Sequence, residues 1–174
     1  QMFGFRVGKT FANAKLSPTI TLWFDSLSGT DDTDVSNGDW GTFDTHMDTG
    51  HKFYGLMDLY LGQSGSKTGY YGLEDFAIKT KFKLSAANTL KLDAHHFRTQ
   101  TDLSDTDSDT LISNDSKIIS TQVQDGGDLG QELDITLVHK YDSNTKIVAG
   151  YSHYWSSQTL AALRNGGDNQ DADW

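Results

Sequence analysis

Cysteine is absent from the 174-residue chain, and proline occurs once, at Pro18. The lack of cysteine excludes disulfides, thiolate metal sites and cysteine nucleophiles. Basic residues are also scarce: 14 Lys and Arg stand against 24 Asp and Glu, a net charge of -10, which argues against nucleic acid as a partner. Long apolar runs are missing too, and none approaches the ~18 residues of a membrane-spanning helix. A transmembrane barrel stays open, because its strands alternate in polarity.

Alternation of apolar and polar residues is the strongest signal in the chain. It predicts six strands with period 2, each about ten residues long, the length that a tilted strand needs to cross a bilayer. The six segments are FGFRVGKTF (3–11), TITLWFD (19–25), DFAIKTKFKL (75–84), TLKLDAHHF (89–97), ELDITLVHKY (132–141) and KIVAGYSHYW (146–155).

The connections between these segments fall into two classes that alternate along the chain. Short turns cover 12–18, 85–88 and 142–145, and long polar connections cover 29–72, 100–129 and 156–170. In an up-and-down meander, all short turns then lie at one end and all long loops at the other, as in outer-membrane barrels. We predict an all-β, antiparallel transmembrane β-barrel, with the long connections as extracellular loops. A soluble β-sheet binding module is the alternative.

Charge is distributed unevenly between loops and strands. Residues 29–49 hold six acids and no Lys or Arg, and residues 99–129 hold seven acids against Lys117. On the polar strand face, seven basic side chains stand against four acidic ones, so this face is predicted to be mildly basic and to line a water-filled pore. The predicted pore-lining residues are Arg6, Asp25, Lys79, Lys81, Lys83, Lys91, Asp93, Glu132, Asp134, Lys140 and Lys146. Lys9 falls on the apolar face, so it either lies near the membrane interface or marks a register slip.

Residues 51–61, HKFYGLMDLYL, are read as part of the first long loop, because a spanning strand here would reverse every later strand. The apolar residues have helical spacing, which predicts a short helix that packs on the rim or folds into the lumen. This segment is the candidate constriction. Its residues in that role are His51, Phe53, Tyr54, Met57, Asp58 and Tyr60.

The acidic stretch DDTDVSNGDWGTF, residues 31–43, invites comparison with a calcium-binding EF-hand loop. A loop starting at Asp32 would need Gly at its sixth position and Glu at its twelfth, where this chain has Asn37 and Phe43. A specific calcium hand is therefore not predicted. Weak surface binding of calcium at Asp32, Asp34 and Asp39 stays open.

Catalytic motifs are not evident, and no enzyme activity or cofactor is predicted. His95 and His96 would point to opposite faces of a strand, and neither Gly-x-Ser-x-Gly nor His-Glu-x-x-His occurs. An outer-membrane hydrolase with Ser-His chemistry is the enzymatic alternative.

Several segments together resemble the alginate-export porin family of Gram-negative outer membranes. Ser28 and Gly29 end a strand, an acidic loop follows, and then come Thr42 to Asp44. "DLGQELDITLVHKYDSNTKIVAGYSHYW", residues 128–155, resembles the family's penultimate hairpin, and "DADW", residues 171–174, the opening of its closing strand. After the acidic loop, the family has a His-x-Phe-Tyr-Gly-x-x-Asp motif, which is matched by His51, Phe53, Tyr54, Gly55 and Asp58. The residues that enter the strand of the penultimate hairpin are matched by Gly130, Glu132 and Asp134. Thr30 departs from the acid expected after Ser-Gly.

The resemblance implies a large single-chain barrel of about 16–18 strands, of which residues 1–174 would be the C-terminal part, with six strands and the start of a seventh. It implies a passive outer-membrane channel for hydrophilic solutes, anionic or saccharide ones among them. The expected contacts are the lipid bilayer, lipopolysaccharide, the polar solute, and a partner protein in the lumen or periplasm. The alternative function is a barrel scaffold that sheaths a partner protein or a cytochrome electron conduit.

Overall fold

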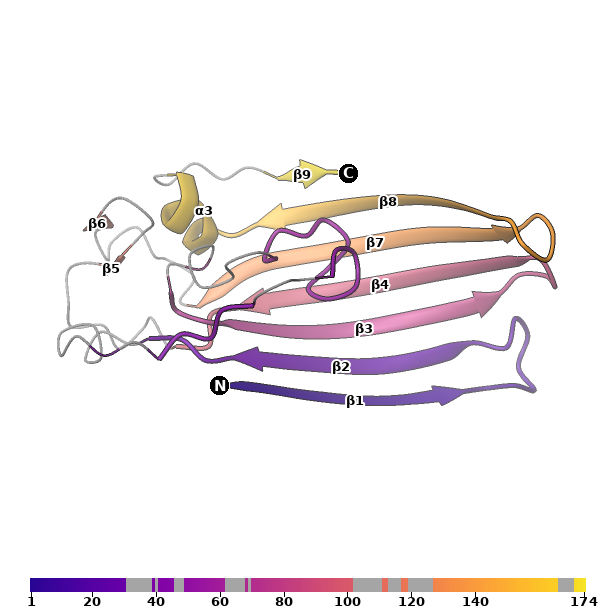
Figure 1. Cartoon of the computed structure of the whole chain (residues 1–174), viewed down its shortest axis with the longest axis horizontal. Coiled ribbons are helices and arrows are strands. Elements are labelled where there is room, and N and C mark those ends of the chain that lie inside the picture. The colour runs from indigo at the N-terminus through magenta and orange to yellow at the C-terminus, as the bar shows by residue number, and fades with distance from the viewer. Residues whose placement is uncertain are drawn as a thin grey trace.

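The computed structural model describes residues 1–30, 39, 41–45, 49–61, 68, 70–101, 111–112, 117–118, 127–165 and 171–174. One antiparallel sheet dominates it, with strands in the order β1-β2-β3-β4-β7-β8-β9, in which each strand pairs with the next one in that order (Figure 1). Its strands are β1 (Met2–Thr10), β2 (Thr19–Leu27), β3 (Leu73–Lys83), β4 (Asn88–Arg98), β7 (Asp128–Lys140), β8 (Lys146–Ser156) and β9 (Ala172–Asp173). A two-stranded sheet pairs β5 (Leu111–Ile112) with β6 (Lys117–Ile118). The predicted all-β, up-and-down architecture is confirmed as an incomplete, unclosed barrel.

The two classes of connection lie at opposite ends of the sheet, as predicted. The turns after β1, β3 and β7 lie at the right of Figure 1, and the strand ends that lead into the long connections lie at the left. The turns are closed by local hydrogen bonds: Asp142 Oδ1 accepts from the amides of Asn144 and Thr145, each at 2.7 Å. We call these ends the turn side and the loop side.

The two faces of the sheet differ as the alternation predicts. Apolar side chains on the outer face are exposed, for example Phe3 (62%) and Ile147 (55%). An apolar face of this extent marks a membrane or protein contact. The pairing of β1 with β2 runs without interruption through Lys9 and Ile20, so the register does not slip. Lys9 lies on the outer face at the turn side, with its Nζ 5.3 Å from the Phe11 ring.

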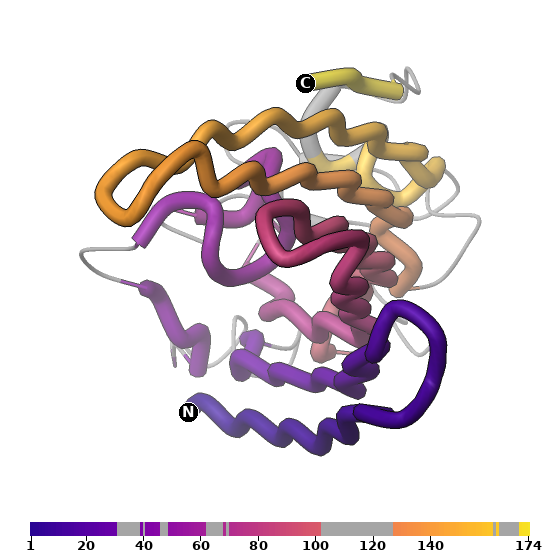
Figure 2. Tube along the Cα trace, turned by 90° about the vertical axis from the view of Figure 1, so that its right-hand side faces the viewer, coloured from indigo at the N-terminus to yellow at the C-terminus, as the bar shows by residue number. Residues whose placement is uncertain are grey.

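Residues 49–61 lie within the curve of the sheet, against its inner face (Figure 2). The predicted helix over residues 51–61 is wrong: the segment is an irregular chain of turns and bends. His51, Tyr54, Gly55 and Asp58 have positive φ, which a right-handed helix does not allow. The amides of Leu56 and Met57 donate to β7 side chains instead of to helical carbonyls.

A helix was not predicted between β8 and β9, and the structure has one there, α3 (Gln158–Asn165). Its N-cap is Ser157, whose Oγ accepts from the Leu160 amide at 3.0 Å. A serine before an apolar run is a helix-start signal, so this element was readable from the sequence.

The buried core lies at the loop side, inside the curve of the sheet. It joins strand residues to residues of α3 and of the stretch 49–61, which we call the inward segment. Its members are Leu27, Tyr54, Tyr60, Leu61, Tyr71, Leu73, Phe97, Leu129, Tyr154, Leu160 and Leu163. The loop side of the inner face is therefore packed, whereas the turn side is open.

Candidate functional site: the inner face of the sheet

Strand register arranges the inner-face side chains in rows across the sheet. One row aligns Arg6, Trp23, Ala77, His95 and Glu132, because these residues pair successively from β1 to β7. The next row toward the turn side aligns Thr21, Lys79, Asp93 and Asp134, and the row after it pairs Lys81 with Lys91. All the predicted pore-lining residues project from this face.

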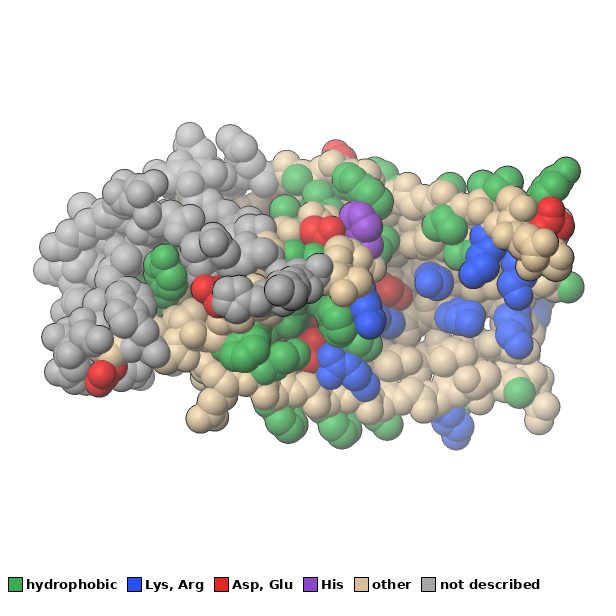
Figure 3. All heavy atoms as spheres, viewed as in Figure 1, with side chains coloured by type: hydrophobic (Ala, Val, Ile, Leu, Met, Phe, Trp, Pro, Cys, Tyr) green, Lys and Arg blue, Asp and Glu red, His purple; other side chains and the backbone are tan. Residues whose placement is uncertain are grey.

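The turn side of the inner face is a basic hollow of about 580 Å³. None of the described residues that line it is acidic, and Figure 3 shows its basic side chains gathered over the turn-side half of the sheet. Its five lysines are all exposed: Lys81, Lys83, Lys91, Lys140 and Lys146. We call this surface the lysine hollow.

Two lysine pairs in the hollow face each other directly across strands. Lys81 pairs with Lys91 between β3 and β4, and Lys140 pairs with Lys146 between β7 and β8. Like charges directly opposite on neighbouring strands destabilise a sheet. The repulsion is relieved when an anion occupies the space between the ammonium groups, so the hollow has the charge of an anion-binding surface.

Three of the four predicted pore-lining acids are buried toward the loop side, and the fourth, Asp93, is partly exposed beside Lys79, whose Nζ lies 3.8 Å from its Oδ2. Asp25 is 0% exposed, Glu132 1% and Asp134 3%. Asp25 accepts from Arg6 Nη2 at 2.6 and 2.8 Å and from Trp23 Nε1 at 2.9 Å. The inner face that solvent reaches is therefore more basic than a count of its charges predicts.

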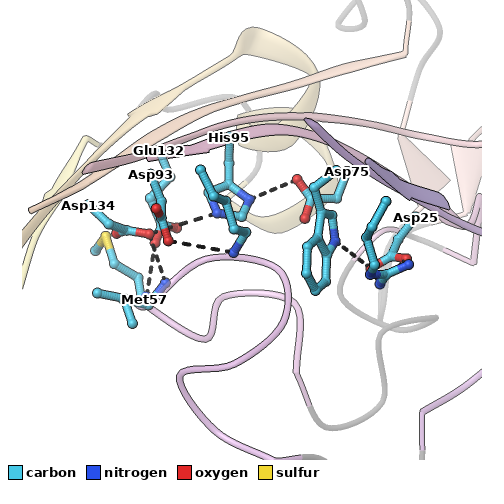
Figure 4. Close-up of polar contacts among 11 residues, drawn as sticks. Asp25, Met57, Asp75, Asp93, His95, Glu132 and Asp134 are labelled. Carbon is cyan, nitrogen blue, oxygen red and sulfur yellow. Dashed lines mark hydrogen bonds and ion pairs between the residues drawn. The ribbon is translucent and has the colours of Figure 1, made fainter. Parts of the chain in front are cut away.

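A buried histidine, which was not among the predicted site residues, lies among these acids. His95 Nδ1 is 2.8 Å from Asp75 Oδ1, and His95 Nε2 is 3.9 Å from Asp134 Oδ2 (Figure 4). Within the described residues, Asp75 Oδ2 and His95 Nε2 are buried without a hydrogen-bond partner. Strand parity could have found both residues, since they share a face with Lys79 and Asp93. His96 points to the other face, as predicted, and is 39% exposed.

Two β7 carboxyl groups hold the inward segment against the sheet. Glu132 Oε1 accepts from the Met57 amide at 3.0 Å, and Asp134 Oδ2 accepts from the Leu56 amide at 3.3 Å (Figure 4). Gly55 has φ +86°, and a Cβ built there would collide with the Glu132 carboxyl group. A residue without a side chain is needed for this approach.

The candidate constriction residues take different positions. Tyr54 and Tyr60 are buried in the core, and Tyr60 Oη lies 2.5 Å from Tyr154 Oη. His51 and Asp58 tie the segment to itself, since Asp58 Oδ1 accepts from the His51 amide at 2.7 Å. Phe53 and Met57 are only partly buried. That the segment narrows a pore stays a prediction.

An aromatic pair joins the inward segment to β2. The Trp23 and Phe53 rings are 6.1 Å apart between centroids. The Arg6 guanidinium lies 3.7 Å from the Trp23 ring centroid, and Lys79 Nζ lies 4.9 Å from it. Cations at these distances are attracted by the ring.

The acidic stretch considered for calcium falls mostly outside the described residues. Asp32 and Asp34 lie outside them, as does His46, and Asp39 is exposed. Among the residues that the structure describes, no three His, Asp or Glu side chains are arranged to hold a metal ion. Over the same residues, no helix has the length and apolar character to span a membrane.

Comparison with known proteins identifies one family. The family model described as alginate export matches residues 1–171, nearly the whole chain. No curated protein and no solved structure matches significantly.

Proposed function

Because the chain belongs to the alginate-export family, a transport family of outer-membrane β-barrels, we propose that it forms part of the wall of a channel for anionic, saccharide-type solutes. The inner face of the sheet would line the passage. The outer apolar face would contact the lipid bilayer and lipopolysaccharide. The proposal needs no cofactor and no catalytic residue.

The paired lysines of the turn side carry this proposal. Lys81 faces Lys91 and Lys140 faces Lys146, in a hollow that no acidic side chain of the described residues lines. A sheet that served only as a scaffold would gain stability from an acid at one position of each pair. Repulsion between the paired lysines lowers the stability of the sheet. It is expected on a surface that attracts anions, because a cluster of positive charges raises the local concentration of anions.

The inward segment supplies the second part of the proposal. Glu132 and Asp134 hold its backbone against β7, so it occupies space inside the curve of the sheet. We infer that residues 51–61 constrict the passage from the loop side, with Phe53 and Met57 as the side chains that reach it. Buried tyrosines fix the segment rather than line the passage.

Ion conductance of the full-length protein in planar bilayers tests the proposed function. The expected result is stable single channels whose reversal potential in a salt gradient reports a preference for anions. A preference for cations would contradict the role of the lysines. Absence of any conductance would favour the alternative, a barrel that sheaths a partner protein or an electron conduit. Monodisperse behaviour without detergent would reject the barrel altogether.

A further inference from the structure

His95 is a buried titratable residue whose contacts the proposed channel does not use. Its side chain is fully covered, and its ring stacks on the Phe97 ring, with centroids 5.5 Å apart and 15° between the planes. Nδ1 lies 2.8 Å from Asp75 Oδ1 in β3, and Nε2 lies 3.9 Å from Asp134 Oδ2 in β7 (Figure 4). The imidazole is therefore fixed between two carboxyl groups.

A neutral imidazole does not satisfy both of these contacts, because it carries a single N–H. With the hydrogen on Nδ1, Nε2 turns a lone pair toward Asp134. With the hydrogen on Nε2, Nδ1 and an ionised Asp75 Oδ1 are two acceptors 2.8 Å apart. Both contacts become favourable when the His95–Asp75 pair holds one additional proton.

Acidic groups outnumber basic ones around His95 in the described strands. Five carboxyl groups stand against one guanidinium and one ammonium group: Asp25, Asp75, Asp93, Glu132 and Asp134 against Arg6 and Lys79. The hydroxyls of Tyr154 in β8 and Tyr60 in the inward segment are hydrogen-bonded to each other. The segment's own charged groups contact the segment itself, Lys52 at the Phe53 ring and Asp58 at His51. An additional proton on the His95–Asp75 pair therefore offsets part of the excess negative charge.

The carboxyl groups beside His95 also hold the inward segment. Asp134 Oδ2, the oxygen nearest to His95 Nε2, accepts from the Leu56 amide at 3.3 Å. Glu132, directly opposite His95 in the register, accepts from the Met57 amide at 3.0 Å. The docked segment withdraws both carboxyl groups from water. Because burial of carboxylates is costly unless their charge is offset, docking favours the state in which the His95–Asp75 pair keeps its proton.

We propose that His95 is a positioning residue that ties docking of the inward segment to one proton, so that the segment docks firmly at mildly acidic pH and loosens as the pH rises. The sign follows from linkage, because the docked state binds the proton more tightly than the undocked state. The docking equilibrium should fall by about tenfold per pH unit at most, over the range in which the proton is lost. The contribution is fully present below about pH 6.5, where a histidine in water is protonated.

This inference deepens the proposed function, because the docked segment is the proposed constriction. Docking is nevertheless measurable without conductance. The full-length protein carries a nitroxide spin label on Lys52→Cys, an exposed position of the segment. The ratio of mobile to immobile label, measured by electron paramagnetic resonance from pH 6 to 9, should rise with pH.

His95→Gln keeps a hydrogen-bond donor but does not titrate in this range, so its label ratio should change little with pH. His96→Gln is the matched control, since this neighbouring histidine lies on the outer face and is 39% exposed. It should keep the rise. An unchanged rise in His95→Gln would show that another group controls docking, and would overturn the proposal.

Asp75→Asn is the second variant, so that the test does not depend on the folding of a single protein. It keeps an acceptor for Nδ1–H but removes the negative charge that favours the proton, so the rise should begin at lower pH. A label ratio that is constant from pH 6 to 9 with His95 and Asp75 intact would also overturn the proposal. Anion-selective channels with that constant ratio would leave the proposed function standing. Cation-selective channels with the expected rise would overturn the proposed function alone.

Discussion

The loop-side and turn-side halves of the inner face use the same strands in opposite ways. At the loop side, acidic side chains are buried, and the two from β7 accept hydrogen bonds from backbone amides of the inward segment. At the turn side, five lysines are exposed, and two pairs of them repel each other. A count over the whole face gives a mildly basic surface. The separation of the charges gives a basic turn side, while Asp25, Glu132 and Asp134 are buried, which is a different electrostatic environment for a solute.

This difference assigns different physical roles to charge in the two halves. Buried carboxyl groups are costly unless hydrogen-bonded, and the two Asp25 oxygens accept from Arg6 Nη2 at 2.6 and 2.8 Å and from Trp23 Nε1 at 2.9 Å. Such groups position other parts of the molecule. Exposed lysines contribute little to stability, so we assign their role to the positive electrostatic potential that they create on the inner face.

The largest effect is expected from reversing one charge in each lysine pair. The double variant Lys81→Glu, Lys140→Glu replaces two repulsive pairs by attractive ones. Anion preference should fall by tenfold or more, since the field of the hollow changes sign at two of five positions. Stability should rise by about 0.5–1 kcal/mol per pair. Reversal potentials and denaturant midpoints measure the two effects on the same protein.

A matched control for the charge reversal is Lys9→Glu, on the outer face at the turn side. It changes the net charge in the same direction but not the charge of the hollow, so anion preference should stay close to that of the wild type. If Lys9→Glu lowers the preference as much as the paired reversals do, the hollow is not the source of selectivity.

A smaller effect is expected from loosening the inward segment. Gly55→Ala places a methyl group at φ +86° and against the Glu132 carboxyl group, which should cost about 1–3 kcal/mol of docking free energy. The segment should detach more often, which raises both single-channel current noise and cleavage by a protease added from outside. Gly50→Ala is the control in the same segment, since among the described residues its Cβ would meet the Asp58 carboxyl group alone, with Oδ2 at 3.1 Å and Cγ at 3.9 Å. Equal noise in the two variants would mean that Glu132 does not hold the segment.

Much of the sheet was predictable from the sequence, because period-2 alternation is a local property. It placed Lys79, Lys81 and Asp93 on one face, and the register bears this out. The same parity puts Asp75 and His95 on that face, but parity does not show which residues are buried together, so neither was predicted as a site residue. Whether a side chain is open or covered could not be predicted, since the cover of Glu132 and Asp134 comes from a segment 75–78 residues away in the chain.

The inward segment shows why local spacing can mislead. Phe53, Met57 and Tyr60 have helical spacing, yet the backbone amides between them bind carboxyl groups of β7. Tertiary hydrogen bonds and four positive φ angles override the local preference. In α3 the local signal was correct but was not used. Ser157 caps the helix, which begins directly after β8 and extends from Gln158 to Asn165.

The smallest effect is expected at the turn between β7 and β8, outside both halves of the inner face. The amides of Asn144 and Thr145 hold the pKa of Asp142 below its usual range. Because the folded pKa lies below the unfolded value of about 3.9, the contribution of Asp142 to stability is present above that value. It is lost as the pH falls through the folded pKa. Asp142→Asn keeps an acceptor for the turn but should remove this acid-range decline, whereas Lys83→Gln, in the hollow, should leave it intact. Denaturant midpoints measured from pH 6 downward distinguish the two, and an identical decline in Asp142→Asn and the wild type would show that the turn does not contribute to it.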